Sequence, residues 1–114
     1  MIITTTIPFT LDQIEHLKEQ FDVYIKTVID VEKKICVAGI DRHFEGEEML
    51  LKGGSKQLNL WGGGLDVNNQ DIDFNSFINI RPNDNNTSNE IQSAETRKAY
   101  LELTKYFFKV IYEK

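Results

Sequence analysis

Two β-branched runs joined by three charged residues constrain the fold of this chain more than any other feature. Residues 24–31 read YIKTVIDV, residues 35–40 read ICVAGI, and EKK lies between them. Valine, isoleucine and threonine favour strands, and so short a link joins antiparallel neighbours. The second run is apolar on both of its faces, which predicts a central position. The sequence therefore predicts an antiparallel hairpin in the middle of a sheet.

The other segments predict a mixture of helices and strands. The run IITTTIPF, residues 2–9, predicts an edge strand that ends at Pro8, and residues 9–21 predict a helix with the capping-box pair Thr10 and Gln13. Acidic residues followed by a double glycine predict a short helix over 45–54, and Ser93 is placed to cap a final helix over 94–114. Two further strands are predicted over 58–67 and 72–82. The expected fold is α+β, with one domain over residues 1–114. It consists of a mostly antiparallel sheet of about five strands, two main helices and one short helix. The helices are expected on one side of the sheet, which gives a two-layer sandwich.

The final helix carries more apolar surface than one sheet face needs. Tyr100, Phe107 and Ile111 share one stripe, and Phe108 and Tyr112 belong to a second stripe beside it. One stripe suffices for a helix that covers a single sheet. The extra width predicts either a homodimer through this C-terminal helix or packing against the first helix.

The net charge and composition limit the classes of partner that we expect for this protein. The net charge of -5 and a pI near 5.0 argue against nucleic acid as the main partner. No stretch approaches the roughly 20 apolar residues of a membrane span, and the N-terminus lacks the basic start of a secretory signal. The single cysteine, Cys36, cannot form an internal disulfide and lies in an apolar run, which favours a buried thiol in a reducing compartment. We expect a cytoplasmic protein without a cofactor.

Three consecutive glycines follow the only tryptophan. If residues 58–67 and 72–82 pair as strands, Trp61 lies beside Asn79 and Arg81, and the glycines leave a shallow floor next to the indole. Arginine can donate two parallel hydrogen bonds to a carboxylate or phosphate. Lys56 and Gln57 precede this strand and lie near the same floor. These five residues form the predicted ligand-binding set, although each alone is also typical of a core or surface position.

Catalytic and metal signals are weak. His43 follows the predicted central strand with Asp41 nearby, and a histidine–carboxylate pair can transfer protons or hold a metal. The chain has no HExxH or CxxC pattern, so no metal site is predicted. GGSKQ lacks the spacing of a phosphate loop. His43 and Asp41 are the only catalytic candidates, and the sequence does not decide whether the protein is an enzyme.

Three segments together resemble a known family. VIDVEKKICVAGIDRH, GSKQLNLWG and NSFINIRP are similar to domain-of-unknown-function family 5674, a group of small bacterial proteins, over residues 23–108. The resemblance implies a compact single domain of unassigned function, with an acid and a histidine at Asp41 and His43. The chain departs from the family pattern at Asn75, where an aspartate is expected, and after Pro82, where arginines are expected.

Two functions remain open at this stage. The first is a binding module for a small anionic ligand, built on a sheet face around Trp61 and Arg81. The second is a protein-interaction domain or homodimer without catalytic activity. A concave pocket that gathers the polar candidates would favour the first, and a flat sheet face covered by another chain would favour the second.

Overall fold

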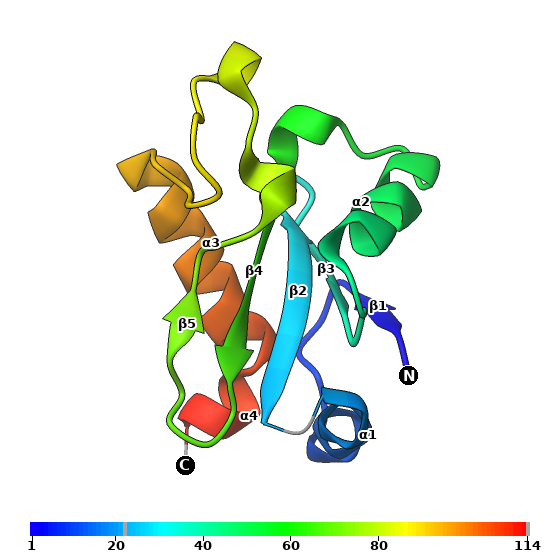
Figure 1. Cartoon of the computed structure of the whole chain (residues 1–114). Coiled ribbons are helices and arrows are strands. Elements are labelled where there is room, and N and C mark those ends of the chain that lie inside the picture. The colour runs from blue at the N-terminus through cyan, green and yellow to red at the C-terminus, as the bar shows by residue number, and fades with distance from the viewer. Residues whose placement is uncertain (22, 114) are drawn as a thin grey trace.

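Five antiparallel strands form one open sheet in the order β1–β3–β2–β4–β5 (Figure 1). This computed structural model describes residues 1–21 and 23–113, without the side chains of residues 19–21. The strands are β1 Ile3–Thr5, β2 Tyr24–Asp30, β3 Ile35–Ala38, β4 Leu60–Asp66 and β5 Ile72–Asp73. The hairpin β2–β3 is central and β1 is an edge strand, as predicted. The α+β fold with a five-stranded antiparallel sheet is therefore confirmed.

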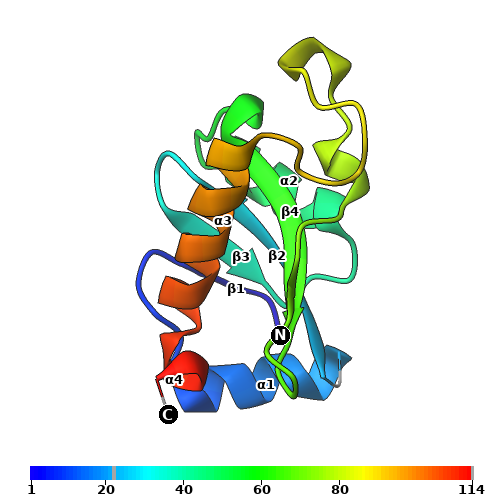
Figure 2. The same ribbon diagram turned by 90° about the vertical axis from the view of Figure 1, so that its left-hand side faces the viewer.

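Helices cover both faces of this sheet. The helices are α1 Leu11–Phe21, α2 His43–Lys52, α3 Ala94–Phe107 and α4 Lys109–Tyr112, with short 3₁₀ turns η1 Gln57–Asn59, η2 Phe77–Asn79 and η3 Pro82–Asp84. Figure 2 shows α3 and α2 on opposite sides of the sheet. None of the helices in the described part of the chain has the length and apolar character that crossing a membrane requires.

Local signals start and stop these elements as the sequence indicates. Thr10 N–H donates to the Gln13 side chain, and Gln13 N–H donates to the Thr10 hydroxyl, which is the predicted capping box. Ser93 accepts from Thr96 N–H at the start of α3. In the β2–β3 turn the Asp30 carboxylate accepts from the N–H groups of residues 32 and 33, which closes the hairpin.

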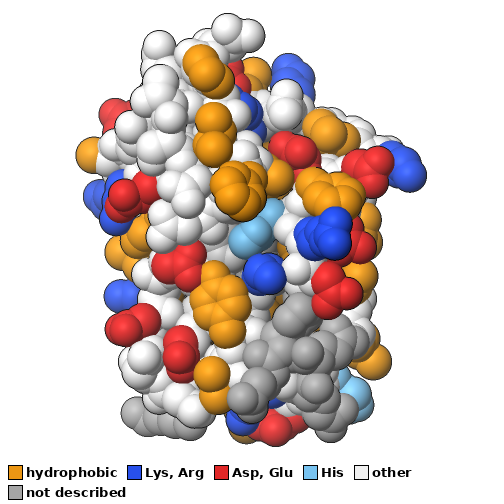
Figure 3. Space-filling model, in the orientation of Figure 1, with side chains coloured by type: hydrophobic (Ala, Val, Ile, Leu, Met, Phe, Trp, Pro, Cys, Tyr) orange, Lys and Arg blue, Asp and Glu red, His pale blue; other side chains and the backbone are white. Residues whose placement is uncertain are grey.

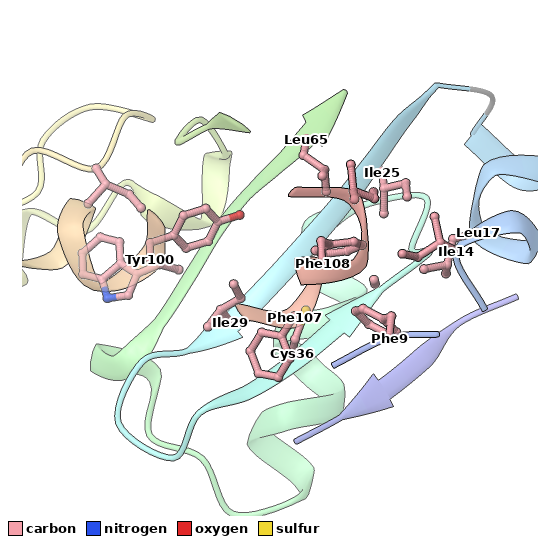
Figure 4. Close-up of a cluster of buried hydrophobic side chains, with 14 residues drawn as sticks. Phe9, Ile14, Leu17, Ile25, Ile29, Cys36, Leu65, Tyr100, Phe107 and Phe108 are labelled. Atoms are coloured by element: carbon pink, nitrogen blue, oxygen red, sulfur yellow. The ribbon is translucent and has the colours of Figure 1, made fainter. Parts of the chain in front are cut away.

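The larger core lies between the sheet and the helices α1 and α3 (Figure 4). Both stripes of the final helical region are used there, because the chain turns at Phe108 between α3 and α4. Tyr100, Phe107 and Phe108 have no exposed surface, and Phe108 packs on Phe9 with ring centroids 4.9 Å apart. The extra apolar width of this region thus packs within the same chain. Cys36 is buried in this core, and burial raises the pKa of its thiol.

The smaller core lies on the other face, beneath α2. Its buried members are Val28, Val37, Ile40, Leu50 and Leu60. Gly46 brings α2 close to this face, since a Cβ at that position would lie 3.0 Å from a methyl carbon of Val28. The two main helices, α1 and α3, lie on one side of the sheet as predicted. The short helix α2 lies on the other side, so the prediction of all helices on one side is wrong for this helix.

The predicted strand over 72–82 is wrong beyond Asp73. Ser76 Oγ accepts from Ile78 N–H and starts the 3₁₀ turn η2. The Asn79 side chain then pairs with the edge of β4, because its amide accepts from Gly62 N–H and donates to Gly62 C=O, each at 2.9 Å. One side-chain amide thus replaces the strand that would otherwise pair with this part of β4.

Candidate functional site

A pocket of about 530 Å³ opens on the α2 side of the sheet, between α2 and the turn η2. Figure 3 shows this face of the molecule, where a histidine and a basic side chain lie between hydrophobic groups. Lining residues come from β2, from the first turn of α2 and the residues before it, and from the loop after β5. They are Lys26, Asp41, Arg42, His43, Phe44, Asn75, Ser76, Phe77, Ile78 and Asn89.

The glycines of β4 place no side chains on the sheet face where the pocket residues His43 and Ser76 pack. Gly62 and Gly64 face the same side as Lys26, since β2 and β4 pair Val28 with Gly62 and Lys26 with Gly64. A Cβ at Gly62 would lie 2.8 Å from Ser76 Oγ and 3.0 Å from His43 Cδ2. The glycine run therefore makes room for His43 and Ser76, and none of its residues has a left-handed backbone among the positive-φ positions of the described chain.

His43 is fixed against the sheet by a backbone carbonyl. Its Nε2 lies 2.7 Å from Gly63 O, and because a carbonyl only accepts, this nitrogen carries the proton. Burial lowers the pKa of His43, and nearby Lys26 lowers it further, while the bond to Gly63 and the charge of Asp73 oppose the change. The ring is neutral near pH 7, with its lone pair on Nδ1.

The predicted partner of His43 was a carboxylate, and the structure shows a different arrangement. Asp41 lines the same pocket, but its side chain is exposed and its backbone carbonyl accepts from Lys26 Nζ at 3.0 Å. The two catalytic candidates are thus brought to one pocket without forming a histidine–carboxylate pair. Within the described residues no cluster of histidine, cysteine and carboxylate side chains could hold a metal ion.

Trp61 and Arg81 do meet, but inside the protein. The guanidinium carbon of Arg81 lies 4.0 Å from the centroid of the Trp61 ring, and the two residues are only 7% and 6% exposed. Arg81 Nη1 donates to Gln57 C=O, and Nε lies 3.6 Å from the Asp84 carboxylate. The predicted open floor beside the indole is therefore closed, because the cation is stacked on the ring and covered.

The remaining predicted binding residues lie outside the pocket. Asn79 is completely buried, and besides Gly62 its amide donates to two further backbone carbonyls, so its polar atoms are all engaged. Lys56 and Gln57 are exposed around η1, and the Gln57 amide lies 3.5 Å from the Glu47 carboxylate. Asn79 is a structural residue, while Gln57 and Trp61 lie together around the covered guanidinium of Arg81.

Comparison with known proteins gives a family and no activity. The model of a family described as proteins of unknown function, DUF5674, matches residues 1–107 of the 114-residue chain. The chain belongs to this family. No curated protein and no solved structure matches the chain significantly. The DUF5674 match begins earlier than the resemblance over residues 23–108 and includes the edge strand and α1.

Several pocket residues of this DUF5674 protein were missed by sequence reasoning. Lys26 stands in a central strand rich in β-branched residues, and alternation along β2 already assigns it to the face of Val28. A lysine at such a position is a usable signal, because lysine is depleted in strands. Asn75, Phe77 and Asn89 could not have been found in this way, since they depend on the turn η2 and on the loop that follows it.

Proposed function

We propose that this DUF5674 protein binds a small anionic molecule in the His43 pocket, with Lys26 as the main charged contact. The observation that carries the proposal is the situation of Lys26. It is half-buried, it stands beside Gly64 of β4 on the same sheet face, and its ammonium donates to the Asp41 carbonyl. Among the described residues it has no carboxylate partner. An ammonium in a concave site without a counter-ion attracts an anion.

The shape and lining of the pocket support the same function. Its volume of about 530 Å³ lies in the range of small-molecule sites, roughly 300 to 1,000 Å³. Arg42 adds a second cation, against Asp41 in the lining and the Asp73 carboxylate, which lies close enough to act on His43. Neutral His43 and the amides of Asn75 and Asn89 supply uncharged polar atoms.

Lys26→Gln should weaken anion binding about tenfold to a hundredfold. A hydrogen bond to a charged group contributes about 1.5 to 3 kcal/mol when it is desolvated, and glutamine removes the charge while keeping a polar side chain one atom shorter than lysine. Titration calorimetry with inorganic phosphate, acetate, benzoate and adenosine monophosphate at constant ionic strength measures this loss. Lys56→Gln is the matched control, because Lys56 is exposed and lies outside the pocket.

Two results would contradict the proposal. In the first, none of the four anions binds the parent protein. In the second, Lys26→Gln and Lys56→Gln bind equally well, so that the attraction comes from overall charge and not from the pocket. The earlier site around Trp61 and Arg81 would regain support only if Arg81→Ala abolished binding while Lys26→Gln did not.

The alternative of a homodimer through the C-terminal helix has less support. It was expected because this helix carries a second apolar stripe, but Phe108 and Ile111 are buried within the chain's own core. The cellular setting remains part of our proposal: a bacterial cytoplasm suits a protein whose only cysteine is a buried free thiol. Sedimentation equilibrium of the purified chain tests the oligomeric state directly.

A further inference from the structure

Two phenylalanine rings stand exposed at the rim of the His43 pocket. Phe77 is 85% exposed and Phe44 is 50% exposed, and both line the pocket. They come from opposite walls, since Phe44 belongs to the first turn of α2 and Phe77 begins the turn η2. Large aromatic side chains at such exposure are uncommon and mark binding surfaces when they gather at one concavity.

The backbone beneath Phe77 holds the ring outward. Ser76 Oγ accepts from Ile78 N–H at 3.2 Å, and Ser76 N–H donates to Asn89 C=O at 2.8 Å. The Asn79 amide secures the other end of the turn through the backbone of Gly62. Ile78 packs against the smaller core, so the residue next to Phe77 is anchored as well. Phe77 therefore cannot fold back onto the core without breaking these contacts.

Phe44 is held in a similar manner. The Glu45 side chain accepts from Arg42 N–H at 2.9 Å, which fixes the first turn of α2 around this residue. His43, immediately before it, is tied to the sheet through Gly63. Phe44 and Phe77 thus each lie in a turn, the first of α2 and the turn η2, that is held in place by hydrogen bonds of the neighbouring residues.

Two amides complete the rim. Asn75 and Asn89 line the pocket and are exposed, and their side-chain amides make no hydrogen bond in the described part of the chain. Each amide offers a donor and an acceptor, which suits the polar edge of a heteroaromatic ring or the polar substituents of a benzene ring. The pocket therefore combines apolar ring faces, neutral polar groups and the ammonium of Lys26.

We propose that the ligand of this pocket is a flat aromatic ring that carries an anionic group. This inference rests on the proposed function and names its substrate class. The ring lies against Phe77 and Phe44, the Asn75 and Asn89 amides contact its polar edge, and the anionic group is bound by Lys26. Aromatic carboxylates and nucleoside monophosphates both have this chemistry.

A panel of ring and charge combinations tests the inference by titration calorimetry. One arm compares adenosine monophosphate with adenosine and inorganic phosphate, and the other compares benzoate with benzyl alcohol and acetate. In at least one arm, the compound with both ring and anion should bind at least tenfold more tightly than either of its parts. The arm that shows the larger difference identifies the source of the ligand.

Variants of Phe77 then separate stacking from general apolar contact. Stacking of one ring on an aromatic side chain changes affinity by roughly tenfold or more. Phe77→Leu should weaken the ring-bearing anion about tenfold and leave inorganic phosphate unchanged, and Phe77→Trp should retain binding. Leu58→Ala is the control, since Leu58 is 56% exposed and lies outside the pocket.

The outcomes distinguish this inference from the proposed function. If phosphate or acetate binds in a Lys26-dependent manner and the ring adds nothing, the anion site stands and the aromatic ligand is wrong. If no compound binds, both are wrong. If sedimentation shows that the parent chain self-associates and Phe77→Leu is monomeric, the rings form a protein interface, and the inference of an aromatic ligand is overturned.

Discussion

Gly63→Ala should destabilise the protein by about 3 kcal/mol or more. A Cβ at this position would lie 2.3 Å from the carbonyl oxygen of Asp73 and 2.6 Å from the hydroxyl of Tyr100. The Asp73 oxygen belongs to the backbone of β5, and the Tyr100 hydroxyl is buried with a 2.6 Å contact to Thr27 Oγ1, so neither can move aside cheaply. Overpacking typically costs 1 to 3 kcal/mol, and more when backbone must shift.

Urea denaturation of the parent and of Gly63→Ala measures this loss. Gly53→Ala is the matched control, since a Cβ there would meet its nearest atoms at 3.5 Å, an ordinary contact. Its φ of -82° also suits alanine, so the change in the free energy of unfolding should stay within about 1 kcal/mol. Equal stability of Gly63→Ala and the parent would show that β4 and α3 do not approach each other as described.

Phe107→Ala should cost about 3 to 5 kcal/mol, which is the usual loss when a buried phenylalanine is truncated. Phe107 has no exposed surface, its ring lies 6.4 Å from that of Phe9, and its carbonyl accepts from Phe9 N–H at 2.8 Å. It therefore joins the end of α3 to the start of α1. Removal of the ring leaves a cavity between two helices and the sheet.

The neighbouring residue provides the control for this substitution. Tyr106 is 42% exposed, and Tyr106→Ala should cost about 1 kcal/mol or less. The midpoint of urea unfolding measures both variants under the same conditions. A loss below about 1 kcal/mol for Phe107→Ala would mean that the apolar stripe of α3 faces solvent or a weak partner instead of the core.

The parts of the fold that were predictable depend on local chemistry. The β2–β3 hairpin follows from β-branched runs around a short turn, and the start of α1 follows from the capping box of Thr10 and Gln13. The edge position of β1 follows from its length and from Pro8. In each case the determining contacts lie within a few residues of one another.

The second half of the sheet was less predictable because side chains replace backbone pairing there. The alternation of residues 74–80 is compatible with a strand, but Ser76 and Asn79 satisfy the backbone by local hydrogen bonds and by pairing with Gly62. Such competition between side chains and a strand ladder is common for serine and asparagine. It depends on the distance to β4, which the sequence does not contain.

The sequence indicated some positions of the candidate residues. Trp61 and Arg81 lie together, and Asp41 and His43 follow the central strand β3, while the roles predicted for these residues stay predictions. Whether a sheet face is open depends on which helix covers it. The short helix α2 lies on the face opposite α3, so the Trp61 face became core and the Lys26 face retained a pocket.

A ¹⁵N-resolved NMR titration with adenosine monophosphate and with benzoate tests the central claim most directly. If the His43 pocket is the binding site, the backbone amide resonances of Lys26, His43 and Phe77 shift progressively and saturate. The indole N–H resonance of Trp61 and the amide of Lys56 stay in place, because neither residue lines the pocket. Shifts that centre on Trp61 and Arg81 while the resonances of Lys26 and His43 remain unchanged would contradict the account.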